Sequence, residues 1–172
     1  MLESYIKDLK NVPLGIGKVD LDVSTYNFMS DKATLITGNN SEVFPDFIKN
    51  LVLEFNSLKT INTILIDADN IFEKYKDIPT NYRDSNFENY LQDASIYIDD
   101  TISNSNVELM VIFVGLEKFV SKVNNNVIND FCNHVRNIDN VHMIFIDTSY
   151  KIKKFVFESW YTNNIVNADG IW

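Results

Sequence analysis

The segment from Gly38 to Pro45 has residue types and a spacing that invite comparison with a phosphate-binding loop. An apolar run, Ala-Thr-Leu-Ile-Thr over 33–37, leads into Gly38, Asn39, Asn40, Ser41, Glu42, Val43, Phe44 and Pro45. A phosphate loop of sequence G-x-x-x-x-G-K-S/T grips a triphosphate with glycine backbone, a lysine ammonium and a hydroxyl on Mg²⁺. When the two are aligned on Gly38, these three positions hold Val43, Phe44 and Pro45.

Each replacement removes something that triphosphate binding needs. Val43 restricts a backbone that requires the conformational freedom of glycine. Phe44 puts a ring where the ammonium would stand, and Pro45 has neither a hydroxyl nor an N–H. Glu42 adds negative charge, so we expect no bound ATP, Mg²⁺ or other cofactor. Because one glycine is a weak signal, an ordinary strand–loop–helix connection remains the alternative.

The hydrophobic pattern predicts an α/β fold around this segment. Short runs rich in apolar and β-branched residues predict strands, and apolar residues at three- and four-residue steps predict helices. The predicted strands are 19–23 (an edge strand), 34–37, 63–67 (a central strand), 107–114, 141–147 and a final region at 164–166 and 170–172; the predicted helices are 45–57, 86–103, 124–138 with an asparagine cap, and 149–160. Such alternation implies a mostly parallel sheet with helices on both faces. The 172 residues suffice for one domain, 1–172.

Ligand sites in such sheets lie at the carboxyl ends of the strands. The places to examine are therefore Gly38–Phe44, Asp67–Asn70, Gly115–Glu117 and Asp147–Ser149. Asp67 and Asp69 could hold a metal as a pair. With no phosphate loop beside them, we favour a hydrogen-bonding role within the loop.

Other polar residues give weaker signals. Cys132, His134 and His142 match no metal-ligand spacing, so no metal site is predicted. We expect a buried, inert thiol, a histidine on a helix surface and a histidine at a strand end. Asp99 and Asp100 should face water, as should the two arginines, Arg83 and Arg136.

Charge excludes several functions. The net charge is −9 and the pI is about 4.6, which argues against nucleic acid and anionic membranes as partners. No apolar run has the length of a membrane span, and we expect no signal peptide.

Four short strings carry a resemblance to a known family: Pro13–Ile16, Leu35–Gly38, Ile64–Asp69 and Ala168–Trp172. In this order they are similar to FtsK/SpoIIIE-type ATPase modules. They most resemble the C-terminal, degenerate ATPase module of the type VII secretion coupling proteins of the EssC type. The resemblance covers about residues 12 to 172 and implies a three-layer, RecA-like fold, with truncation at the C-terminus as an open alternative.

The family's second nucleotide motif is also altered. That motif is an apolar strand ending in paired acids that hold Mg²⁺. Here Val111–Val114 supplies the strand, but Gly115 and Leu116 stand where the acids would be, and Glu117 comes one place late. We expect Glu117 to be a solvated loop residue and the module to have no catalytic residues.

The resemblance implies a role in protein recognition within a secretion motor. Such a module receives the C-terminal signal of small helical-hairpin substrates of the WXG100 type, around a pocket that Val43 and Phe44 would make apolar. Further implied partners are adjacent ATPase modules in a hexameric ring and other secretion components. The implied location is the cytoplasmic face of a membrane-anchored parent protein. Two alternatives remain: a weakly active ATPase completed by a neighbour, and a purely structural ring module.

Overall fold

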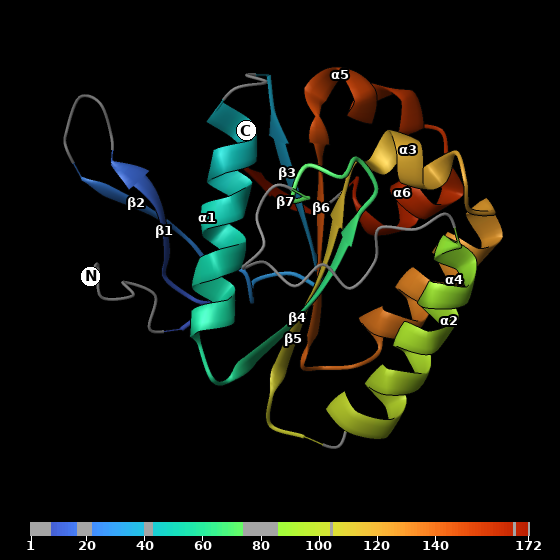
Figure 1. Cartoon of the computed structure of the whole chain (residues 1–172), viewed down its shortest axis with the longest axis horizontal. Helices are drawn as coiled ribbons and strands as arrows, with labels where there is room; N and C mark the ends of the chain where they lie inside the picture. Colours follow the sequence, from blue (N-terminus) through green and yellow to red (C-terminus); the bar gives the residue numbers. More distant parts are fainter. Residues whose placement is uncertain are drawn as a thin grey trace.

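A five-stranded parallel sheet forms the centre of the protein in a computed structural model, which describes residues 8–16, 22–39, 43–73, 86–103, 105–166 and 168–171 (Figure 1). Its strands are β3 (Ala33–Gly38), β4 (Ile61–Asp67), β5 (Glu108–Val114), β6 (Val141–Thr148) and β7 (Asp169–Ile171), in the spatial order β4-β5-β6-β3-β7. Every neighbouring pair is parallel. The predicted α/β fold with a parallel sheet is confirmed.

Successive side chains of these strands point to opposite faces of the sheet and pack into two separate hydrophobic cores. Ile64, Val111 and Phe145 point into one cluster, whereas Leu65 and Ile112 point into the other. Both faces of the sheet are therefore buried, which explains why the strand sequences are continuous apolar runs and do not alternate between apolar and polar residues.

Helices cover both faces, as predicted (Figure 1). On one face lies α1 (Val43–Ser57), whose Ile48, Val52 and Phe55 are buried. The other face is covered by α2 (Phe87–Tyr97), which continues as a π-helical turn (Ile98–Ile102), and by α3 (Leu116–Val120), α4 (Asn125–Arg136) and α6 (Ser159–Asn164). The Asn124 side chain accepts a hydrogen bond from the Asn126 N–H and caps α4, so the predicted asparagine cap is confirmed.

A separate antiparallel ribbon consists of β1 (Val12–Ile16) and β2 (Val23–Tyr26). Of the strand predicted at 19–23, residues 19–21 lie outside the described part of the chain, Asp22 is not in a strand, and β2 begins at Val23. Pairing of Ile16 with Val23 and of Val12 with Tyr26 sets the strand, rather than the apolar–polar alternation upstream.

The position of β4 differs from the expectation. β4 lies at one edge of the described sheet, not at its centre. Its sequence is a continuous apolar run because both of its faces are covered, by α1 on one side and by the α2 core on the other. The helix predicted over 149–160 is broken: α5 (Ser149–Ile152) passes into a 3₁₀ turn (Lys153–Phe155), and α6 starts afresh at Ser159, because the chain turns tightly where the Glu158 N–H donates to the Phe155 carbonyl.

The strand region predicted at 164–166 does not form. Asn164 ends α6, and the N–H groups of both Ile165 and Val166 donate to the carbonyl of Tyr161 as the helix closes. The final strand begins at Asp169 and confirms the second half of that prediction, except for Trp172, which the structure does not describe.

The thiol of Cys132 is fully buried in α4 and unpaired. Burial raises its pKa to about 12, although Arg136 opposes that shift. Since the thiolate is the reactive species, we expect no reaction with a thiol-specific reagent at pH 8 in the native state and full reaction in denaturant. A colorimetric thiol assay measures both, and rapid labelling of the native protein would show that the α4 core opens readily.

Candidate functional site

The carboxyl ends of four strands meet at one edge of the sheet, where α5 follows β6 at the top of Figure 1. In the strand registers, Gly38 lies beside Thr148, Asp67 beside Val114, and Val114 beside Ile146. A pocket of about 170 Å³ opens at this edge and is lined by Phe44, Pro45, Asp69, Ile71, Val114, Gly115, Ile146, Asp147, Thr148 and Lys151. All four segments chosen from the sequence thus contribute to one place.

The first turn of α1 folds back over the end of β3. A Cβ atom added to Gly38 would lie 2.8 Å from the ring of Phe44, so the ring packs directly on this glycine. Phe44 is half-buried against the α1 core, and Pro45 lies in the first turn of α1, as expected. Asn40, Ser41 and Glu42, and the side chain of Val43, lie outside the described residues. On the described side of this loop, an aromatic ring covers the strand end.

Gly115 has a role that the sequence comparison did not anticipate. Its φ of 77° is left-handed, and an added Cβ would lie 2.5 Å from Cγ of Asp69. Only glycine meets both conditions without strain. The residue standing where the family has an acid therefore lets the β4 loop approach β5 closely.

A lysine links two carboxylates across the pocket. Lys151 Nζ lies 3.2 Å from Oδ2 of Asp69 and 3.5 Å from Oδ1 of Asp147. Burial alone would lower the pKa of Lys151, but the two carboxylates outweigh it and the pKa is raised. The buried Asp147 also accepts hydrogen bonds from the N–H groups of Glu117 and Thr148, at 3.0 and 2.7 Å. Sequence reasoning missed Lys151; its only signal is the four-residue spacing from Asp147 on the way into a helix.

Leu116 and Glu117, the other two residues that the sequence comparison aligned with the acidic motif, lie in different surroundings. Leu116 is fully buried in the core. We expected Glu117 to be a solvated loop residue, and this expectation is wrong. Glu117 lies in the first turn of α3, where its carboxylate pairs with Lys154. The hydrogen bond from Lys154 lowers the pKa of Glu117, while burial opposes that shift.

Asp67 has the hydrogen-bonding role that we favoured. Its fully buried carboxylate accepts hydrogen bonds from the N–H groups of Ile71 and Phe72, at 3.1 and 2.8 Å. Asp69 instead faces Lys151, so the two aspartates do not face a common metal position. Among the described residues, no group of three or more metal-binding side chains lies together.

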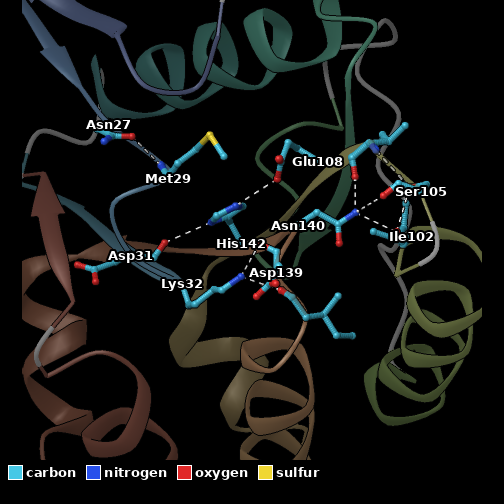
Figure 2. A network of polar contacts seen from close by, with 12 residues as sticks. Asn27, Met29, Asp31, Lys32, Ile102, Ser105, Glu108, Asp139, Asn140 and His142 are labelled. Carbon is cyan, nitrogen blue, oxygen red and sulfur yellow. Dashed lines mark hydrogen bonds and ion pairs between the residues drawn. The ribbon is translucent and has the colours of Figure 1, made fainter.

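The histidines lie away from this pocket. His142 is buried at the amino end of β6, with Nε2 3.3 Å from Oε2 of Glu108 and Nδ1 3.3 Å from the carbonyl oxygen of Asp31 (Figure 2). His134, half-buried on α4, lies 3.0 Å from Oδ1 of Asp99. The expected strand-end and helix-surface positions are both confirmed, and so is the exposure of Asp99 and Asp100.

Of the two arginines, the structure describes only Arg136. Arg136 is exposed, as expected, and donates a hydrogen bond to the carbonyl of Asn163. Arg83 lies outside the described residues.

The fold is that of the RecA-like ATPase domains of type VII secretion. The cytoplasmic domain of the type VII secretion ATPase EccC from Thermomonospora curvata superposes with a TM-score of 0.68 at 13% identity, over 90% of this chain and 21% of that chain. ATPases 2 and 3 of the same EccC, in complex with a signal sequence peptide, give 0.68 at 14% identity, over 94% and 34%. ATPases 2 and 3 of EssC from Geobacillus thermodenitrificans give 0.65 at 13% identity, over 92% and 32%.

At this identity the likeness establishes the fold alone, and the chain spans about a fifth to a third of those structures. No family model matches the sequence, and no curated protein does. Within the described residues, no helix is both long and apolar enough to cross a bilayer.

Proposed function

We propose that this chain is a non-catalytic ATPase-like module of a type VII secretion coupling protein and that it recognises secretion substrates. The observation that carries the proposal is the ring of Phe44 packed on Gly38, at the place where a phosphate loop would leave room for a triphosphate. A nucleotide needs a site of about 300–1,000 Å³, as drug-sized ligands do, and the pocket here holds about 170 Å³.

The charges of the pocket support the same proposal. The ammonium of Lys151 is already shared by Asp69 and Asp147, and no further cation lines the pocket among the described residues. A triphosphate would bring three or four negative charges beside those two carboxylates without a partner for them. We therefore expect neither ATP nor Mg²⁺ to bind, and no catalysis.

The apolar part of the pocket suits a peptide anchor. Phe44, Ile71, Val114 and Ile146 provide a floor for one aliphatic or aromatic side chain. One solved relative is in complex with a signal sequence peptide, which favours a peptide as the ligand of this module.

The wider assignments belong to the same proposal. The chain would be a single module, 1–172, whose partners are WXG100-type substrates, adjacent ATPase modules and other secretion components. The relatives named above are cytoplasmic domains or pairs of ATPase modules. By analogy, this module would face the cytoplasm within a membrane-anchored parent.

Peptide titration tests the proposal. C-terminal peptides of WXG100-type substrates, labelled with a fluorophore, should bind with saturable anisotropy, and Phe44→Ala should weaken binding about tenfold or more, as expected for a central aromatic anchor. Tyr97→Ala is the matched control, because Tyr97 is a partly exposed aromatic residue on α2 that does not line the pocket.

Phe44→Leu keeps an apolar side chain at this position. Comparing it with Phe44→Ala therefore distinguishes a loss of local packing from the loss of the contact between the aromatic ring and the peptide. No binding by the unmodified chain, or equal binding by the Phe44→Ala and Tyr97→Ala variants, would contradict substrate recognition at this pocket.

A further inference from the structure

A second pocket, of about 290 Å³, lies at the opposite end of β3, beside its first residue. It is lined by Asp31, Lys32, Ala33, Arg136, Asn163, Asn164 and Ala168. These residues come from the start of β3 and the loop before it, from the end of α4, and from the segment between the end of α6 and β7, so the pocket joins three distant parts of the sequence. Neither the phosphate-loop comparison nor the proposed function involves it.

The ammonium of Lys32 is fixed at this pocket by backbone carbonyls. Its Nζ donates to the carbonyl oxygens of Ile138 and Asp139, at 2.7 and 2.5 Å (Figure 2). An ammonium has three N–H donors, so one remains for a ligand. Burial lowers the pKa of Lys32, while nearby Asp139 and Glu108 oppose that shift. No carboxylate in the described structure lies within ion-pair distance of this ammonium.

A second cation is anchored on the opposite wall. Arg136, in the last turn of α4, donates from Nη2 to the carbonyl oxygen of Asn163 at 2.6 Å. That bond uses one of the five guanidinium donors and orients the others. Arg136 likewise has no ion-pair partner in the part of the chain that the structure describes. Two cations without ion-pair partners around one pocket stand out in a chain whose net charge is −9.

The pocket wall also offers hydrogen-bond acceptors. Asn164 is 4% exposed, and its Nδ2 donates to the carbonyl of Trp160 at 2.7 Å. This bond fixes the orientation of the amide, and its Oδ1 has no partner among the described residues. Because Oδ1 is also closed off from solvent, it does not face a ligand in the pocket. Asp31 adds a carboxylate to the same wall.

We propose that this pocket binds the α-carboxylate of an amino acid residue together with the N–H on the same residue. Lys32 and Arg136 would hold the carboxylate from two sides, and the carboxylate of Asp31 would accept from the N–H. A plain oxyanion such as phosphate satisfies the two cations but meets the carboxylate of Asp31. A volume of about 290 Å³ accommodates a single residue. A free amino acid and the carboxyl terminus of a peptide share this chemistry.

Calorimetric titration of the whole chain with small probes tests the proposal. L-Alanine represents the free amino acid and N-acetyl-L-alanine the peptide end. Each probe is titrated up to about 20 mM, so that millimolar affinity is covered. Saturable binding of either probe supports the site. The probe that binds more tightly shows whether the ligand is a free amino acid or the carboxyl terminus of a peptide. N-acetyl-L-alanine methyl ester, which lacks the carboxylate, should not bind. No saturable binding of either acid, equal binding of the ester, or binding of inorganic phosphate as tight as that of the acids would overturn the proposal.

Two charge variants place the binding in this pocket. Arg136→Gln should weaken binding of the better probe about tenfold, because it removes a charge-assisted hydrogen bond. Lys153→Gln removes an exposed cation that does not line this pocket, and it should bind as the unmodified chain does. Arg136→Lys should restore part of the affinity. Denaturation midpoints verify that each variant is folded, and equal affinities of Arg136→Gln and Lys153→Gln would contradict the assignment.

Discussion

Replacing Gly115 with alanine should destabilise the protein by about 2–4 kcal/mol. The backbone of Gly115 is left-handed, with φ of 77°, which costs an L-residue about 1–2 kcal/mol. The new methyl group would also lie 2.5 Å from Cγ and 2.9 Å from Cβ of Asp69, and overpacking of this kind costs about 1–3 kcal/mol. Urea denaturation followed by tryptophan fluorescence measures the loss.

The matched control is Gly15→Ala. Gly15 lies in β1, its φ is not left-handed, and no atom lies within 4 Å of the position of an added Cβ. Its substitution should change stability by less than about 0.5 kcal/mol, as is usual for exposed sites. If Gly115→Ala is as well tolerated as Gly15→Ala, the close approach between the β4 loop and the end of β5 is wrong.

Removing the carboxylate of Asp67 should have a similar effect, of about 2–4 kcal/mol for Asp67→Ala. The carboxylate is fully buried and accepts two backbone hydrogen bonds, from Ile71 and Phe72. Each buried N–H left without an acceptor costs about 1–3 kcal/mol. Denaturant midpoints of the variant and the unmodified chain, compared at equal slope, give the difference.

Asp67→Asn serves as the graded control for that experiment. The amide retains one oxygen acceptor and removes the other, so its loss of stability should be about half that of the alanine variant. Equal stability of all three proteins would show that the loop after β4 does not depend on this side chain.

The sheet could be predicted from the sequence because its strands carry dense local signals. Runs such as Leu109–Val114 and Met143–Ile146 are apolar on both faces and are flanked by polar residues or glycine. Their alternation with amphipathic helices determines the parallel arrangement. The position of β4 at the edge could not be derived, since a strand covered by helices on both faces has the same composition at the edge as at the centre.

The candidate site could be predicted in outline but not in its contacts. Strand ends converge in any parallel sheet, so the four loops were predictable from the strands alone. The ion pair of Lys151 with Asp69 joins residues 82 positions apart and depends on the short helix α5, which the sequence presents as part of one long helix. Apolar residues recur at helical spacing through 149–160, and the tight turn closed by the Glu158 N–H on the Phe155 carbonyl, which breaks the helix, has no local signal in that pattern.

We propose that the strand end at Gly38 keeps the layout of a nucleotide site, while the ring of Phe44 and the ion pairs of Lys151 exclude the nucleotide. Isothermal titration of the whole chain with Mg·ATP tests it most directly. The account predicts no saturable heat in the micromolar range. Micromolar binding that is lost on substitution of Phe44 or Ser41 would contradict it.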